Sequence, residues 1–180
     1  METLPLGRAF TLIEPGPVVL VSTHDGKRPN VMTISWTMVL DFSARFAITT
    51  GPWNHSFAAL SDQRDCVISI PGAGMLDTVI GIGTCSGRKT DKFARFGLRA
   101  LRASKVTPPL IGGCLAHIEC RVEEIIAGHD IVILQGLAAH LDPGVSDRRL
   151  IHAVGDGTFT ADGEHFDRRA LMRAKLPEGV

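Results

Sequence analysis

Apolar and polar residues alternate strictly between positions 32 and 40 of the chain. One face carries Met32, Ile34, Trp36, Met38 and Leu40, and the other carries Thr33, Ser35 and Thr37. A period of two is typical of a strand whose successive side chains point to opposite faces. The pattern predicts one long strand with a face of hydroxyls and an apolar face that buries the ring of Trp36.

A second strand and a short helix follow this segment. After a polar turn at residues 41–45, the run Phe46–Thr50 predicts a strand that stops at Gly51-Pro52. Asn54 is placed to cap a helix that runs through Leu60. Hydroxyls beside a helix N-terminus offer donors and a favourable dipole to a phosphate, although they also fit an exposed strand face without a ligand.

The rest of the pattern predicts a mainly β protein. Asp25-Gly26 is a hairpin turn, Thr90 is placed to cap a helix over 91–96, and a further helix is expected near 75–82. The alternation of residues 114–122 directs His117, Glu119 and Arg121 outward and Cys114 and Cys120 inward. Further strands are expected at 17–23, 66–70, 131–141 and, on either side of a turn, 158–160 and 164–166. Many strands at short spacing favour a barrel over alternating βαβ units, in one domain spanning residues 1–180.

Charge and composition exclude several function classes. Lys plus Arg and Asp plus Glu are both 19, so no global field favours nucleic acid or a membrane. The four cysteines lack C-x-x-C spacing and the histidines are dispersed, which predicts a reduced, cytoplasmic chain without a metal site. No apolar run approaches the ~20 residues that span a bilayer. One stretch is strongly basic, and fits a solvated face, an anionic ligand, a dinucleotide or nucleic acid: Arg88, Lys89, Lys92, Arg95, Arg99, Arg102 and Lys105.

Two short stretches resemble nucleotide-binding motifs and are rejected. Gly81-Ile-Gly83 followed by Gly87 has one residue too many for a dinucleotide fingerprint, and it follows a predicted helix instead of a strand. Gly87-Arg-Lys-Thr90 lacks the glycine that must precede the lysine of a Walker A loop. No G-x-S-x-G sequence occurs, so kinase-type and hydrolase-type readings are both excluded.

Three separated stretches together resemble the flavin reductase-like (flavoredoxin) family of FMN-binding split barrels. They are Asn30–Trp36, Gly51–Phe57 and Ser86–Phe93, and the similarity runs in order from about residue 15 to 141. The resemblance implies a Greek-key split barrel with a few short helices, and a homodimer with FMN near its interface. It also implies hydride transfer from NADH or NADPH to flavin N5, and a second electron acceptor such as a monooxygenase.

The family resemblance also implies a set of cofactor-binding residues. The first stretch would line the isoalloxazine, the second would hold the phosphate or ribityl chain, and the third would close over the phosphate. The residues carried over are Asn30, Met32, Thr33, Ile34, Ser35 and Trp36; Thr50, Gly51, Asn54, His55, Ser56 and Phe57; and Ser86, Gly87, Arg88, Asp91 and Lys92. No catalytic side chain and no metal ligand are expected, because the cofactor carries the chemistry.

Two departures from the family pattern stand out. Many relatives carry Gly-Asp-His before the last barrel strand, whereas this chain has Gly128-His129-Asp130. The chain has no Tyr, so a ring stacked on the flavin would come from Trp36, Trp53 or Phe159. A non-catalytic FMN or haem binding module on the same barrel is the alternative, because a fold does not settle a function.

Overall fold

The computed structural model of the 180-residue chain describes residues 1–176, which form a mainly β structure with short helices. The strands are β1 Glu2–Leu4, β2 Val19–His24, β3 Pro29–Ile34, β4 Thr37–Asp41, β5 Arg45–Thr49, β6 Asp65–Ile70, β7 Ala100–Leu101, β8 Leu110–Ile111, β9 Ala116–Ile126, β10 Ile131–Leu141, β11 Ile151–Ala153 and β12 Phe159–Ala161. The helices are α1 Ser56–Gln63, α2 Leu76–Gly83, α3 Lys92–Arg95 and α4 Arg169–Met172, with 3-10 turns at Leu6–Leu12, Ala73–Met75, Ala127–His129 and Arg173–Lys175. The predicted fold class is therefore confirmed at the level of its elements.

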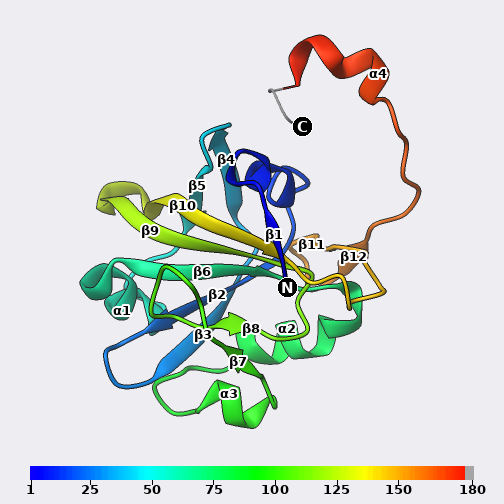
Figure 1. The fold of residues 1–180 in the computed structure, drawn as a ribbon. Helices are drawn as coiled ribbons and strands as arrows, with labels where there is room; N and C mark the ends of the chain where they lie inside the picture. The colour runs from blue at the N-terminus through cyan, green and yellow to red at the C-terminus, as the bar shows by residue number, and fades with distance from the viewer. Residues whose placement is uncertain (177–180) are drawn as a thin grey trace.

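The main sheet is antiparallel and strongly curled (Figure 1). Its strands follow the order β3-β2-β6-β9-β10-β5-β4, and β1 pairs with the far end of β10. The two strands at the ends of this order, β3 and β4, are consecutive in the chain. Residues 35–36 therefore join the two edges of the sheet, which gives the sheet its half-barrel shape.

Two hydrophobic cores hold the sheet in place. The larger core fills the inside of the curl with residues such as Phe46, Leu60 and Ile118. The smaller core lies between the other face of β2 and β3 and the helices α2 and α3, where Leu20 and Val31 pack with Val79, Ile82 and Phe93. Because β3 is covered on both faces, its position relative to α2 and α3 is fixed.

The predicted long strand over residues 32–40 is wrong. β3 ends at Ile34 and pairs with β2, whereas β4 begins at Thr37 and pairs with β5. Trp36 is 68% exposed instead of buried, and Met38 is 53% exposed. Alternation of apolar and polar residues indicates which face of a sheet a side chain lies on. It does not show that the chain leaves one strand partner, β2, and pairs with another, β5, on either side of residues 35–36.

Two predictions about strand faces also fail. His117 and Glu119 of β9 are fully buried rather than outward, because the segment between β7 and β9 covers that face of the sheet. Cys114 precedes β9 and packs in the smaller core, apart from Cys120 in the larger one. Near the C-terminus, β12 pairs with β11 and not with residues 164–166, which form no strand.

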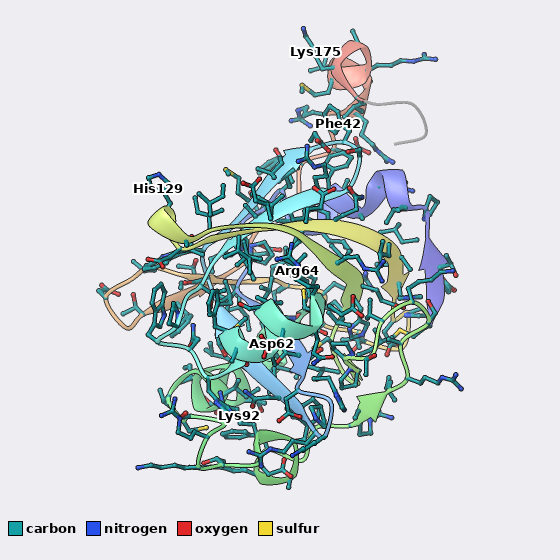
Figure 2. All side chains as sticks on the ribbon, turned by 90° about the vertical axis from the view of Figure 1, so that its left-hand side faces the viewer. Phe42, Asp62, Arg64, Lys92, His129 and Lys175 are labelled. Carbon is teal, nitrogen blue, oxygen red and sulfur yellow. The ribbon has the colours of Figure 1, made fainter. Side chains whose placement is uncertain are left out.

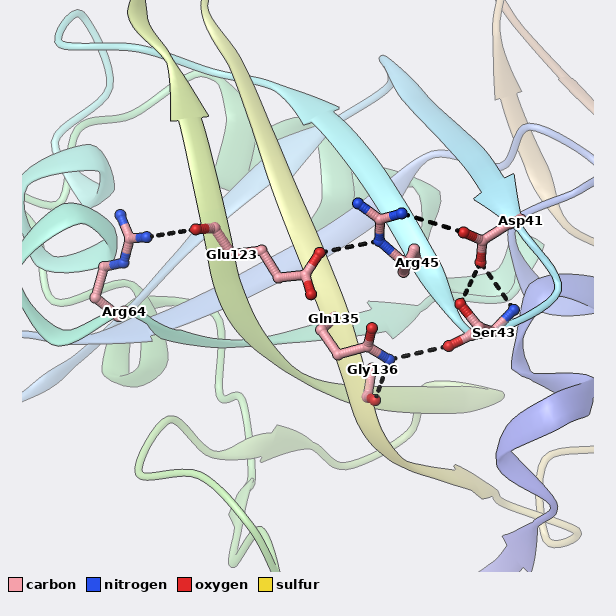
Figure 3. A network of polar contacts seen from close by, with 7 residues as sticks. All are labelled: Asp41, Ser43, Arg45, Arg64, Glu123, Gln135 and Gly136. Atoms are coloured by element: carbon pink, nitrogen blue, oxygen red, sulfur yellow. Dashed lines mark hydrogen bonds and ion pairs between the residues drawn. The ribbon is translucent and has the colours of Figure 1, made fainter.

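Exposed polar side chains tie the outer surface of the half-barrel together (Figure 3). Arg45 of β5 donates to Glu123 of β9 at 2.9 Å and contacts Asp41 of β4 at 3.3 Å. Arg64, at the end of α1, donates to the Glu123 carbonyl at 2.8 Å. Within residues 1–176 no helix has both the length and the apolar character needed to cross a bilayer.

Candidate functional site

The three sequence stretches singled out above meet along one groove. The groove consists of three adjoining cavities of about 220, 190 and 350 Å³, and neighbouring cavities share residues such as Trp53 and Trp36. The first cavity lies between β3, the start of α1 and the segment that joins α2 to α3. The other two follow the break between β3 and β4 toward β5 and the start of β10.

The polar end of the groove is built around Asn30 of β3. The Asn30 side-chain amide donates to the Ser56 hydroxyl at 2.8 Å, which fixes the first residue of α1 against the strand. Gly87 packs directly on the same asparagine, since a Cβ at Gly87 would lie 2.3 Å from Asn30 Oδ1. Only glycine therefore allows the 84–91 loop to approach this closely. The three segments form one continuous wall.

The 84–91 loop is ordered by its own backbone bonds. The Lys89 amide donates to the Ser86 carbonyl, and the Arg88 amide donates to the Ser86 hydroxyl at 3.3 Å. Asp91, and not Thr90, caps α3 by accepting the Ala94 amide at 3.0 Å. Aspartate is the better acceptor for the unpaired N–H groups of a first helical turn, so the predicted cap was displaced by one residue.

Lys92 has an unusual environment for a lysine. Its side chain is 6% exposed, and its ammonium donates to the Val31 carbonyl at 2.9 Å and the Ile82 carbonyl at 2.8 Å. Burial lowers the pKa of Lys92 below its usual value. Lys92 forms no ion pair within residues 1–176, and two carbonyls use only two of its three N–H donors. A buried cation with a spare donor that lines a cavity favours an anion there.

The other end of the groove is apolar and open. Trp36 and Trp53 line its middle cavity and are 68% and 62% exposed. Asn54 does not cap α1; its amide donates to the Thr50 hydroxyl at 3.0 Å, and the helix begins without a side-chain cap. The Thr50 hydroxyl in turn contacts the Met32 sulfur at 3.7 Å. Two exposed indoles beside a hydroxyl-lined floor suit a large planar ring.

Most of the residues expected from the resemblance line this groove: Asn30, Met32, Thr33, Ile34, Ser35, Trp36, Asn54, His55, Ser56, Ser86, Gly87 and Lys92. The others lie beside it. Thr50 and Gly51 support Asn54 and Trp53, Phe57 packs on the larger core, and Arg88 is exposed on the loop. Asp91 serves as the cap of α3.

Some lining residues were not expected from the sequence. Thr84 and Cys85 line the polar cavity, and both directly precede the third stretch. Met38, Ala47 and Ile131 line the outermost cavity, which no local sequence signal indicates, because they come from three different strands. Phe159 packs on the smaller core and does not line the groove.

The histidine of the reordered Gly128-His129-Asp130 sequence lies apart from the groove floor. His129 is exposed at the tip of the β9–β10 hairpin (Figure 2), and it does not line any of the three cavities. Asp130 adopts a left-handed conformation, φ 55°, and its carbonyl accepts the Thr50 amide at 2.9 Å. The aspartate therefore supports the strand end that carries the groove.

Comparison with known proteins identifies the family. The model of the flavin reductase-like domain matches residues 12–158. The chain belongs to the flavin reductase-like family. An uncharacterised Escherichia coli (strain K12) protein, YddH, is 28% identical over 178 residues, covering 89% of this chain and 94% of that protein.

Solved structures establish the split-barrel fold. An FMN-binding domain of flavin reductase-like enzymes from Shewanella baltica superposes with a TM-score of 0.83 at 23% identity, over 92% of this chain and 95% of that one. Flavoredoxin of Desulfovibrio vulgaris (Miyazaki F) superposes with a TM-score of 0.78 at 23% identity, over 85% of this chain and 90% of that one. For the NADH:FAD oxidoreductase SgcE6 of Streptomyces globisporus the TM-score is 0.63 at 21% identity, over 71% of this chain and 76% of that one. For nitrilotriacetate monooxygenase component B of Mycobacterium thermoresistibile the TM-score is 0.69 at 20% identity, over 91% of this chain and 93% of that one.

Proposed function

We propose that this flavin reductase-like protein binds FMN in the groove and acts as an NAD(P)H:flavin oxidoreductase. The observation that carries the proposal is the buried ammonium of Lys92 at the polar end of the groove, which has a spare donor and no carboxylate partner in the part of the chain that the structure describes. A phosphate bound there would balance its charge. The family supports the same assignment.

The residues of the polar end fit a phosphate and a ribityl chain. Ser56 and Ser86 supply hydroxyls, and the N-terminus of α1 adds backbone donors with a favourable dipole. Arg88, exposed on the covering loop, adds a second positive charge close to the surface. The residues present therefore fit the phosphate of FMN.

The apolar end of the groove fits the isoalloxazine. Ser35 and Trp36 lie between the ladders of β3 and β4, so their backbone is outside regular pairing on at least one side. Such groups can bond the polar edge of the ring, while Trp53 covers its face and excludes water. FMN held by these residues would supply the redox chemistry, namely acceptance of hydride at N5 from NADH or NADPH and transfer of electrons to a second acceptor. The task of the protein is to position, cover and tune the cofactor.

Dimerisation is part of the proposal. Trp36, Met38 and Trp53 expose large apolar surfaces around the outermost cavities, where a ring bound in one chain would be covered on one side only. A second copy packed on this face would bury them, with roughly 2,000 Å² of interface in total. Light scattering should therefore give twice the 19.4 kDa of one chain at micromolar concentration, and a monomer that retains FMN would contradict it.

The spectrum of the freshly purified protein tests the function. We expect a yellow protein whose flavin band bleaches when NADH or NADPH is added without oxygen. A flavin band that neither donor changes would favour the non-catalytic binding module. The physiological acceptor, such as a monooxygenase, and a cytoplasmic location are part of the proposal. The structural similarity to component B of a monooxygenase supports an acceptor of this kind, and the similarity to SgcE6, an NADH:FAD oxidoreductase, supports a nicotinamide donor.

A further inference from the structure

A C-terminal arm, residues 163–176, extends away from the body of the protein (Figures 1 and 2). The residue before it, Asp162, is tied to the body, since its carboxylate accepts the Leu150 amide at 3.1 Å and contacts the His152 imidazole at 2.8 Å. Beyond Asp162 the arm is exposed along its whole length apart from Leu176, which is half-buried. Among the described residues, the hydrogen bonds of the arm join arm residues to one another. The arm therefore contributes little to the packing of its own body.

The arm is both apolar and basic. Phe166, Leu171 and Met172 are 65%, 83% and 50% exposed. Around the last two residues the arm carries four cations, and within residues 1–176 only the second of them has an acidic partner: Arg168, Arg169, Arg173 and Lys175. A helix as short as α4 is not stable in water by itself. Its exposed leucine and methionine therefore need an apolar surface that the arm's own body does not supply in this structure.

The outer face of β4, β5 and β10 has such a surface. Residues that pair directly across antiparallel strands lie on the same face of a sheet. The register places Met38, Ala47, Ile133 and Glu124 in one row across four strands, and Trp36 lies beside Met38 in the outermost cavity of the groove. These five residues are named the outer strip. The strip starts at two exposed apolar side chains and ends at a carboxylate.

The arm and the outer strip are complementary in charge as well as in polarity. Glu124 is exposed and forms no ion pair in the part of the chain that the structure describes. The cations Arg173 and Lys175 directly follow the apolar pair of the arm, so they can reach this carboxylate when the pair covers the apolar part of the strip. The six residues before α4 span up to about 20 Å when extended, which allows the arm to cross to a neighbouring molecule.

We propose that the arm of one copy of this chain packs on the outer strip of a second copy. Leu171 and Met172 cover Trp36 and Met38 of the partner copy, and the cations that follow them lie near its Glu124. In a symmetric pair each arm closes the apolar end of the other copy's groove. The inference rests on the proposed function, because it names the segment that covers the groove taken as the FMN site.

The first test removes the apolar contacts of the arm in the full-length chain. The double variant Leu171→Ser, Met172→Ser should raise the dimer dissociation constant at least about a hundredfold, because both arms of each dimer lose their apolar side chains. Analytical ultracentrifugation measures this constant. Val154→Ser, which replaces an exposed apolar residue of the β11–β12 turn outside the arm, is the matched control and should leave the constant unchanged.

Disulfide trapping identifies the surface that the arm contacts. One chain carries Leu171→Cys, another carries Met38→Cys, and the two are mixed and mildly oxidised. We expect a linked pair of chains, whereas Asp62→Cys, on the exposed side of α1, should give none in place of Met38→Cys. A single chain that carries both Leu171→Cys and Met38→Cys should link to another chain. A bridge within one chain would mean that the arm folds back on its own body, and it would overturn the inference.

The outcomes for the arm and for the proposed function can be told apart. If the double variant dimerises as tightly as the wild type, the inference is overturned, while FMN binding in the groove stands. If the double variant dissociates but the wild type does not bind FMN, the proposed function falls and the exchange of arms stands. A monomeric wild type that binds FMN would overturn the exchange of arms, and the arm would then serve a partner other than a second copy.

Discussion

Two segments of this protein are each anchored by a buried charge, and the two charges have different hydrogen-bond partners. Lys92, the first residue of α3, donates to the Val31 carbonyl of β3 and the Ile82 carbonyl of α2, with a third donor left over. Glu119 lies under the 100–109 loop, where it accepts the Ser104 and Lys105 amides, the Ser104 hydroxyl and, at 2.7 Å, His140. Lys92 lines the groove and has no counter-charge among residues 1–176, whereas both carboxylate oxygens of Glu119 accept hydrogen bonds.

The pKa of Glu119 reflects this pairing. Burial raises the pKa, but the hydrogen bonds from Ser104, His140 and Lys105 outweigh burial and leave it below its usual value. A buried charge therefore does not by itself indicate a ligand site. Unused hydrogen-bonding capacity that faces a cavity does, and Lys92 has it while Glu119 does not.

The largest expected effect is on stability at Glu119. Glu119→Ala leaves the loop amides and His140 without their acceptor, and removing one partner of a buried polar network costs about 3–5 kcal/mol. The thermal midpoint should fall by roughly 6–20 °C, while FMN affinity changes less than about threefold. Glu123→Ala, on the exposed part of the same strand, is the matched control and should barely move the midpoint. A loss of FMN binding equal to that of a Lys92 variant would show that Glu119 supports the ligand site as much as Lys92 does.

The pH dependence of the free energy of unfolding should depend on a second buried residue of β9, His117. His117 is fully buried, its Nε2 has no partner within the described chain, and burial lowers its pKa from 6.5 to about 4. Between these two pKa values the unfolded chain binds a proton that the folded protein does not. The contribution of His117 to the free energy of unfolding is therefore fully present above about pH 6.5 and is lost as the pH falls toward 4. The loss is about 3 kcal/mol at 1.36 kcal/mol per pKa unit.

Urea unfolding measured across this pH range checks the prediction. Since the pKa of Glu119 is also lowered, its contribution is lost only in more acidic solution, below its unfolded value of about 4.5. His117→Gln should flatten the slope between pH 6.5 and 4 and leave the acidic part unchanged. An unchanged profile in this variant would exclude His117 as its origin.

Removing the charge of Lys92 should act mainly on the ligand. A hydrogen bond to a charged group is worth about 1.5–3 kcal/mol, so Lys92→Met should weaken FMN at least about tenfold. Riboflavin, which lacks the phosphate, should change less than about threefold, and fluorescence titration measures both. Lys89→Met, an exposed lysine on the same loop, is the control. Equal weakening of both ligands would mean that Lys92 only holds the loop against Val31 and Ile82.

The smallest effect is expected at Arg88. Its side chain is exposed, so its attraction to a phosphate is screened by water and salt. Arg88→Met should weaken FMN about two- to threefold at low ionic strength, and the difference from wild type should vanish in 1 M salt. An effect as large as that of Lys92→Met would mean that the loop closes over the ligand and buries Arg88.

The sequence predicted the individual elements better than their surroundings. Three elements were predicted correctly, because they depend on local alternation and turn chemistry: the strand at Phe46–Thr50, the Asp25-Gly26 turn and the strand at 66–70. The burial of His117 could not be predicted. Alternation assigns His117 to the second face of its strand, but it does not show that the segment between β7 and β9 covers that face. The exposure of Trp36 likewise depends on the change of pairing partner at residues 35–36.

The candidate site was predictable as a set of segments and not as contacts. Three stretches in family order pointed to one place, and the fold brings them to one groove. The buried environment of Lys92 could not be predicted, because a helix of four residues is too short for its hydrophobic periodicity to show which side is buried.

The short link between β3 and β4 has a consequence for the order in which the protein folds. β2–β3 and β4–β5 are local hairpins that can form early, but the rest of the sheet must assemble between them before their edges meet around residues 35–36. We infer that the groove forms only after the long-range pairing of β5 with β10, because the residues that line it come from strands that this pairing joins. FMN should therefore slow unfolding in proportion to its affinity while leaving the refolding rate unchanged, as stopped-flow measurements with and without the cofactor would reveal.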